Sequence, residues 1–273
     1  MSFHVSNSLI ETYRYRAKSK NIENLNGRNG NRLLTKFIIT KIIEQVSVRD
    51  GMNIIDVGCG DASLFKVLLQ DGLVTQKSKL IGILPTAEEV ERVANDIERN
   101  YSNLSNKLSI VRGTADNLDI STGQADLLIC NGVLHGNGQN YNDFKKSLKE
   151  FNRVLKIGGT VYIGELPDVD EMKGKNYGNS LLQWLIYLKK ERGLNDFIDG
   201  LKTILKSIFG SEPFIFVPKY MFFIERKQLG KVLKAYGFKI ISEKRHQEIT
   251  HEGKEIQSNT RWNYVAVKSK NVN

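Results

Sequence analysis

Apolar and polar residues follow two periodicities along the chain, and these predict which segments are strands and which are helices. Short apolar runs predict five strands, at residues 53–57, 80–84, 108–111, 126–130 and 160–163. Between strands, apolar residues recur at spacings of three and four, as Val90, Val93 and Ile97 do, which predicts helices. This alternation predicts right-handed crossovers and a mainly parallel sheet, whose ligands bind beyond the carboxyl ends of the strands.

The second half of the chain breaks this rhythm. Apolar positions predict two consecutive helices at 180–192 and 194–209, then a helix at 225–236 and two strands at 238–242 and 263–268. We expect the last two strands to be antiparallel neighbours. The result is an α/β protein in four parts: an N-terminal helical cap (1–50), a core (51–167), a helical insertion (168–224), and a last helix with two strands that complete the core (225–273).

Composition limits the classes of protein that fit this pattern. Of 273 residues, 40% are hydrophobic and 26% charged, which is ordinary for a soluble globular protein. No apolar run is as long as the roughly 18 residues that cross a bilayer, and the N-terminus lacks the features of a secretory signal. Two cysteines, Cys59 and Cys130, fit neither a disulfide framework nor a zinc cluster. We therefore expect a protein of the bacterial cytoplasm with no metal site.

The net charge of +10 is concentrated near the two ends of the chain. Residues 1–50 carry nine Lys and Arg against four Asp and Glu, and residues 219–254 carry the same numbers. A basic surface suits nucleic acid, an anionic membrane surface or an acidic small substrate, and it also serves plain solubility. Charge therefore leaves the partner open.

The segment NIIDVGCGDASLF, residues 53–65, carries the strongest chemical signal. A strand delivers Asp56, Gly58-x-Gly60 makes a sharp turn, and a helix begins near Asp61. A dinucleotide-binding turn would need a third glycine where Ser63 stands. The acid before the first glycine would repel a pyrophosphate and attract an ammonium group. A structural turn that binds nothing is the alternative reading.

This segment resembles motif I, D-x-G-C-G, of class I S-adenosylmethionine-dependent methyltransferases. The resemblance implies a Rossmann-like fold with a mainly parallel seven-stranded sheet, helices on both faces and, here, a helical insertion after the fifth strand. It also implies S-adenosyl-L-methionine as cofactor, with its methionyl ammonium beside the acid. The implied cofactor-binding residues of motif I are Asp56, Gly58, Cys59, Gly60 and Asp61.

Further segments are similar to other parts of this family. Residues 125–136 resemble motif IV, which implies that Asn131 and Gly132 face the methionyl part of the cofactor. Residues 148–165 resemble the helix, turn and fifth strand that follow. Residues 111–119 resemble the adenine-binding turn, which implies roles for Thr114, Ala115 and Asp116. In that turn Thr114 replaces the usual acid, so its hydrogen bond would be uncharged.

The stretch LIGILPTAEE, residues 80–89, departs from the family pattern. Leu84 stands where a carboxylate usually takes the ribose hydroxyls, so the resemblance aligns Leu84 with the ribose. Thr86 and Glu89 read as a capping box, and Glu88 is the alternative partner for the ribose. Three outcomes stay open: another side chain or a water binds the ribose, cofactor affinity is modest, or the ligand differs from unmodified S-adenosylmethionine.

Motif IV also bears on the acceptor. It lacks the proline and aromatic residue that hold a flipped base, and Cys130 is not preceded by proline, so nucleic acid is disfavoured without being excluded. We expect an acidic small molecule instead, methylated on oxygen, such as a sugar, a nucleotide-linked sugar or a phosphate or phosphoramidate metabolite of carbohydrate biosynthesis.

An alcohol acceptor needs a general base, and His135 and Glu165 lie at or just past the ends of predicted strands. A packing role for His135 is equally compatible with the sequence. The basic N-terminal segment offers Tyr13, Arg14 and Arg16 to an anionic acceptor, because arginine matches phosphate oxygens well. A solvated basic helix is the alternative interpretation.

The predicted insertion carries a broad apolar surface. Residues 180–209 would form a lid over the acceptor, a homodimer interface or a membrane contact, and we favour the first two. For the whole chain, the alternatives to a small-molecule methyltransferase are an RNA methyltransferase and a non-catalytic protein that binds an S-adenosylmethionine-like ligand.

Overall fold

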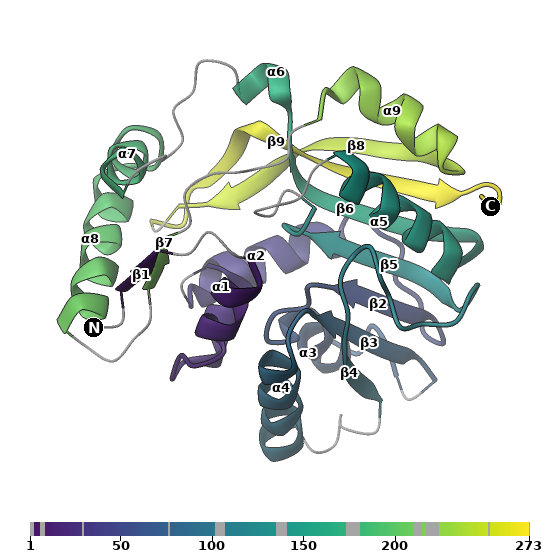
Figure 1. Ribbon diagram of the computed structural model, residues 1–273, viewed down its shortest axis with the longest axis horizontal. Helices are drawn as coiled ribbons and strands as arrows, with labels where there is room; N and C mark the ends of the chain where they lie inside the picture. The colour runs from purple at the N-terminus through teal and green to yellow at the C-terminus, as the bar shows by residue number, and fades with distance from the viewer. Residues whose placement is uncertain are drawn as a thin grey trace.

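The computed structural model describes residues 3–5, 9–28, 30–75, 77–101, 107–134, 141–172, 181–209, 214–216, 224–250 and 252–272. Its centre is a seven-stranded sheet of order β4-β3-β2-β5-β6-β9-β8 (Figure 1). The strands and helices of its first half are β2 (Asn53–Val57), α3 (Ser63–Gln70), β3 (Lys79–Leu84), α4 (Ala87–Asn100), β4 (Leu108–Arg112), β5 (Ala125–Asn131), α5 (Tyr141–Val154) and β6 (Leu155–Pro167). In the part of this order that runs β4-β3-β2-β5-β6, every pair of neighbouring strands is parallel, which confirms the predicted fold class.

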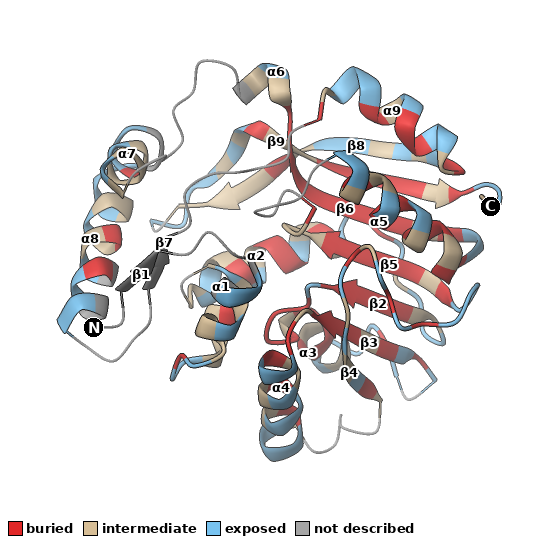
Figure 2. Ribbon diagram, viewed as in Figure 1, coloured by how far each residue is buried: buried red, intermediate tan, exposed pale blue. Residues whose placement is uncertain are grey.

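Alternating side chains of the buried strands supply two apolar cores, one on each face of the sheet. On one face Ile55 and Leu128 pack with Phe144 of α5 and Leu229 of α9 (Arg226–Ala235). On the other, Leu127 packs in a cluster that also takes residues from α3, α4 and α2 (Arg32–Ile43). Burial follows the central strands closely (Figure 2). Helices therefore cover both faces, as the family resemblance implies.

The last two strands, β8 (Phe238–Ile249) and β9 (Glu255–Lys268), are much longer than the sequence predicted. They pair with each other and β9 pairs with β6, all antiparallel, so the sheet is mixed. The sequence prediction stopped at Ser242 because the following residues, EKRHQEI, are polar. Backbone pairing to β9 nevertheless carries β8 onward, and it brings His246 into a buried position.

The N-terminal elements are α1 (Leu9–Arg16), a short 3-10 helix η1 (Ile22–Asn26) and α2, and α2 packs against α3 and β8. Strand β1 (Phe3–Val5) pairs in parallel with β7 (Phe214–Phe216), a contact that the sequence pattern did not predict. After α6 (Val169–Met172), the predicted insertion forms α7 (Leu181–Tyr187), a π-helical turn (Leu188–Arg192) and α8 (Leu194–Phe209).

Helices α7 and α8 lie at one side of the molecule, next to β1 and β7 (Figure 1), and Asn195 of α8 donates to Glu252 in the turn between β8 and β9. In the described ranges of the chain, no helix is both long and apolar enough to cross a membrane. The boundaries of the four predicted parts stay a prediction.

Candidate functional site

The turn after β2 needs glycine at two positions, because a side chain there would collide with neighbouring residues. Gly58 and Gly60 have φ angles of 75° and 57°, which favour glycine. A Cβ on Gly58 would lie 2.4 Å from a methyl group of Val133, and one on Gly60 would lie 2.1 Å from Oδ1 of Asn26. The turn therefore lies close against both the residues after β5 and the N-terminal segment.

The N-terminal segment holds the turn by a direct hydrogen bond. The backbone N–H of Asp61 donates to Oδ1 of Asn26 over 3.1 Å. The carboxylate of Asp61 accepts from the N–H and hydroxyl groups of Ser63, at 3.0 and 2.5 Å, at the start of α3. Asp61 therefore fixes the helix start, and its own position is fixed by Asn26.

Asp56 carries an unusual carboxyl group at the end of β2. It is buried, and among the described residues it makes no hydrogen bond through its side chain. Burial raises the pKa of Asp56 to about 7, the nearby Arg28 lowers it, and Asp61 raises it. A cation placed beside this buried acid would stabilise its charged form.

Cys59, in the middle of the turn, is packed into the sheet. Its thiol is buried, and burial raises its pKa well above the ordinary value. A Cβ on Gly82 of β3 would lie 2.6 Å from its sulfur. The backbone N–H groups of Gly58 and Cys59 donate to the carbonyl of Ile83 at 2.9 and 3.2 Å, so β3 supports the turn from behind.

Leu84, aligned by resemblance with the ribose, is 2% exposed and belongs to the apolar core beside α3 and α4. The predicted capping box is present, since Thr86 caps α4 and accepts from the N–H of Glu89 at 3.3 Å. The Thr86 hydroxyl also donates to the Glu89 carboxylate at 2.9 Å. Burial raises the pKa of Glu89 to about 7, and Thr86 and Arg16 lower it.

The three predicted acceptor-binding residues of α1 lie differently. Arg14 reaches away to the exposed Glu88, 3.5 Å from its carboxylate, so Glu88 is engaged on the surface. Arg16 lies 5.8 Å from the ring centre of Tyr13 and near enough to Glu89 to lower the pKa of that acid. Burial raises the pKa of Tyr13, and the closeness of Arg16 lowers it. Tyr13 and Arg16 therefore lie near the buried Glu89, whereas Arg14 lies beside the exposed Glu88.

The predicted adenine-binding residues form a tight turn after β4. The backbone groups of Thr114 and Asn117 exchange two hydrogen bonds, at 3.2 and 3.0 Å, and Ala115 is buried. Asp116 is half-buried and Thr114 is exposed. Gly113 donates to the carbonyl of Leu84, which attaches the turn to the end of β3.

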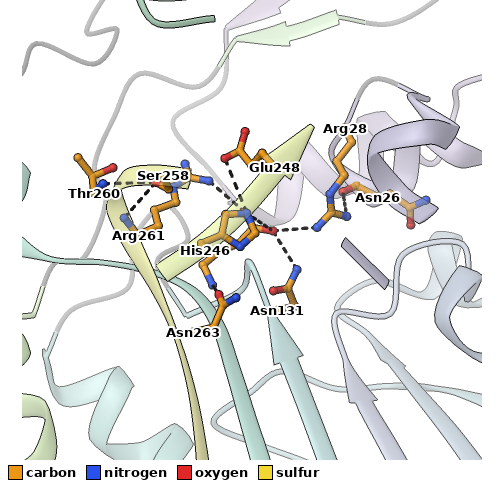
Figure 3. Close-up of polar contacts among 10 residues, drawn as sticks. Asn26, Arg28, Asn131, His246, Glu248, Ser258, Thr260, Arg261 and Asn263 are labelled. Carbon is orange, nitrogen blue, oxygen red and sulfur yellow. Dashed lines mark hydrogen bonds and ion pairs between the residues drawn. The ribbon is translucent and has the colours of Figure 1, made fainter. Parts of the chain in front are cut away.

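Glu165, near the end of β6, is the centre of a charged cluster. Its neighbours Arg28, Asn131 and Arg261 are labelled in Figure 3. Its φ angle of 58° is uncommon for a residue with a Cβ, and it lies where the pairing of β6 with β9 is irregular. Its backbone N–H donates to Oδ1 of Asn263. Oε1 accepts from Arg28 and from Nδ2 of Asn131, both at 2.9 Å, and Oε2 accepts from Arg261 at 3.0 Å.

This cluster bears directly on the predicted motif IV. A Cβ on Gly132 would lie 3.5 Å from the Glu165 carboxylate, and Asn131 donates to it, so the ends of β5 and β6 share one polar site. Because Glu165 already accepts from two guanidinium groups and an amide, it is poorly suited to the predicted role of proton acceptor. His135, the other predicted base, lies outside the described residues.

Sequence reasoning missed three members of the cluster. These are Arg28 and Arg261, which lie far apart in the sequence, and His246, whose polar neighbours do not predict a buried position. In the structure His246 is 2% exposed and lies 4.0 Å from Glu165 and 3.7 Å from Glu248. Residues 243–248 are all polar, so no alternation of apolar and polar residues marks a strand here.

The donor set around the turn fits the methionyl end of S-adenosylmethionine. That end carries an ammonium and a carboxylate, and the site supplies the buried Asp56 and the nearby Arg28. The glycines allow the turn to pack directly against Val133 and Asn26. The part of the pattern that does not fit is the ribose position, where Leu84 offers no polar group.

Comparison with protein families gives one match. Residues 55–163 match the family model described as a methyltransferase domain. A search of curated proteins finds no match to the chain.

Several solved structures share the fold. A chain of the Haloferax volcanii Trm112 methyltransferase activator complex is 13% identical, with 94% of this chain and 98% of that chain covered and a TM-score of 0.58. An S-adenosylmethionine-dependent methyltransferase from Aquifex aeolicus is 14% identical, with 91% and 98% covered and a TM-score of 0.54. Geranyl diphosphate C-methyltransferase from Streptomyces coelicolor, solved with S-adenosyl-L-homocysteine, is 11% identical, with 86% and 79% covered and a TM-score of 0.53. At these identities the likeness shows the fold.

The sheet order and these likenesses define the fold, which is the Rossmann-like fold of the class I methyltransferases. Residues 55–163 are similar to the methyltransferase domain family, and S-adenosylmethionine is the cofactor that this likeness supports. The cofactor supplies a methyl group on a sulfonium centre. The residues that bind it stay a prediction.

Proposed function

We propose that the protein transfers the methyl group of S-adenosylmethionine to an oxygen atom of a small anionic acceptor. The acceptor would be a sugar, a nucleotide-linked sugar, or a metabolite with a phosphate or phosphoramidate group. The supporting observation is the convergence of Arg28 and Arg261 on Glu165, beside Asn131 and Gly132 at the strand ends. Their side chains are 19% and 27% exposed, so both are partly accessible to a ligand.

Arg28 is suited to link the acceptor, the cofactor and the N-terminal segment. Its Nη1 donates to the carbonyl of Asn26 at 3.2 Å and its Nη2 to Glu165, and a guanidinium carries five N–H donors in all. An anionic group on the acceptor would take further donors from Arg28 in fork geometry. Tyr13 and Arg16 of α1 lie on the same side of the turn and would extend this surface.

The test is a methyl-transfer assay with S-adenosylmethionine and matched acceptors: glucose 1-phosphate, UDP-glucose and glucuronate, each against neutral glucose. We expect methylation of an acidic member and none of glucose. Arg28→Gln should raise the KM of the acidic acceptor by about 10-fold or more, the effect of losing one charge-assisted contact. The control is Arg99→Gln, an exposed arginine at the end of α4. Methylation of RNA, or of glucose as readily as its phosphate, would overturn the proposal.

We also propose that α7 and α8 form a homodimer interface. Apolar side chains that are more than a third exposed gather on these two helices, namely Leu182, Ile186, Leu194, Ile198, Leu205, Ile208 and Phe209. Charges of both signs lie among them, as in the Asp199–Lys202 pair, which suits a protein partner better than an anionic membrane.

A further inference from the structure

Buried polar atoms without partners are concentrated at one place in this molecule. In the part of the chain that the structure describes, four buried side-chain atoms lack a hydrogen-bond partner, and three of them belong to Asn131 and His246. A buried polar atom left unpaired destabilises the folded protein. Their clustering around Glu165 indicates groups that are prepared for a ligand.

His246 is held among charges on every side. Its ring lies between Glu165 of β6 and Glu248 of β8, and the guanidinium groups of Arg261 from β9 and Arg28 from the N-terminal segment face the same space (Figure 3). Burial lowers the pKa of His246, the two glutamates raise it, and the two arginines lower it. The ring is therefore neutral near pH 7 and offers one N–H donor and one lone pair.

The orientation of Asn131 follows from its partner. A carboxylate only accepts hydrogen bonds, so the Asn131 atom that contacts Glu165 must be the NH₂ group. The amide oxygen then points to Gly164, where a Cβ would lie 2.0 Å from it. Glycine at 164 thus allows this unpaired oxygen to lie close against the backbone of β6.

We propose that His246 accepts the proton of the acceptor's hydroxyl group during methyl transfer, an assignment that rests on the proposed function. The acceptor's anionic group would lie on Arg28 and Arg261, the partly exposed members of the cluster, and this brings its hydroxyl group toward His246 and Asn131. Glu165 keeps the arginines and Asn131 in place and takes no proton.

The proton and electrons balance within this site. As the acceptor oxygen bonds to the methyl carbon, its O–H bond breaks and the proton passes to the free ring nitrogen of His246. The carbon–sulfur bond breaks with its electron pair on sulfur, so the sulfonium becomes a neutral thioether. The imidazolium that results is stabilised by Glu248 and Glu165, at 3.7 and 4.0 Å, and later releases its proton to water.

The variant His246→Gln tests the assignment, because glutamine retains hydrogen-bonding groups and cannot accept a proton near neutral pH. With glucose 1-phosphate as probe, kcat should fall about 100- to 10,000-fold. Affinity for S-adenosylhomocysteine, measured by calorimetry, should stay unchanged. At saturating S-adenosylmethionine, the acidic limb of the pH profile of kcat/KM for glucose 1-phosphate should disappear. The control Gln45→Met removes the remaining unpaired buried oxygen, which lies just after α2, and should leave kcat unchanged.

Carbon NMR of the His246 ring gives a reading that does not depend on turnover. In wild type the ring should titrate below pH 6.5 and lower still in Glu248→Gln, and glucose 1-phosphate with S-adenosylhomocysteine should shift its signal. Turnover kept within about threefold in His246→Gln would overturn the assignment. A ring that responds to glucose 1-phosphate in a wild-type protein that transfers no methyl group would overturn the proposed function instead, and neither response nor turnover would overturn both.

Discussion

Asp56 carries a carboxyl group that is unusual at neutral pH, because burial raises its pKa. It is buried beside a glycine turn, and its pKa of about 7 leaves it only partly ionised in the free protein. An ammonium group bound next to it would favour the charged form strongly, because an opposite charge within hydrogen-bonding distance lowers an acid's pKa. Cofactor binding and loss of this proton are therefore coupled.

The affinity for S-adenosylmethionine should depend on pH in a way that Asp56 dictates. Only the ionised acid binds the ammonium, so affinity should rise about tenfold per pH unit below pH 7 and level off above it. An α-amino group itself loses its proton near about pH 8, so affinity should fall again beyond that. Calorimetry between pH 5.5 and about 8.5 measures this profile.

The matched variant Asp56→Asn separates this acid from Glu89, whose pKa is also about 7. Asparagine should weaken binding at pH 7.5 and flatten the acidic limb, whereas Glu89→Gln should retain the limb. An Asp56→Asn protein with the wild-type profile would show that the ammonium lies elsewhere.

At the scale of single residues, the sequence predicted site residues that lie close together in the chain and missed those that lie far apart. Asp56 and the two glycines stand within five positions, so their shared role is visible in one segment. Arg28 and Arg261 meet only because an N-terminal loop and the last strand end at the same edge of the sheet. No local pattern around either arginine carries that information.

Between elements, the closest fit is that of the glycine turn against β3. The sulfur of Cys59 occupies the space that a side chain at position 82 would need, and Ile110 of β4 presses on the same point, 2.8 Å from a Cβ there. Three neighbouring strands therefore meet with no spare volume. The family-like glycine at position 82 has its physical reason in this packing.

Gly82→Ala should destabilise the protein by about 1–3 kcal/mol, the usual cost of overpacking a core. Denaturant unfolding measures the change. Adding Cys59→Ala removes the sulfur and should recover part of the loss, whereas additive effects of the two substitutions would contradict a direct contact. Gly230→Ala on α9 is the control, because a Cβ there meets only a methyl group at 4.0 Å.

Elements with strong apolar periodicity were predictable from the sequence, whereas the polar second half of β8 was not. Its first residues read as a strand, and the rest pair with β9 although their sequence is polar. Antiparallel pairing can continue where one neighbour supplies the hydrogen bonds, whatever the side chains. His246 escaped prediction for the same reason, since the missed half of β8 carries it.

For the whole molecule, the sheet, the two helix layers and the insertion followed from the sequence, and the way the N-terminal segment crosses the site did not. Asn26 contacts the glycine turn and Arg28 contacts β6, so this segment joins the two halves of the strand-end site. Nothing in its composition distinguishes that role from a solvated basic helix.

The α7–α8 pair poses a problem at the same scale. Gly200 lets Trp184 and Leu188 pack closely between the two helices, and this uses their inner faces. The outer faces still expose large side chains, with Leu182 67% and Phe209 84% accessible. Exposed apolar patches of this extent mark interaction sites, and two copies of the same patch can bury each other in a symmetric interface.

The proposed interface predicts a dimer that one charge should weaken. Leu205 on α8 is 51% exposed, and Leu205→Glu should raise the dimer Kd about tenfold or more, since a buried charge would then lie unpaired at the contact. Sedimentation at several concentrations measures this. The control is Ile157→Glu in the turn within β6, where a 59% exposed side chain lies on a different element. A wild-type protein that stays monomeric at all concentrations would refute the interface, and the exposed faces would then be left for the lid role.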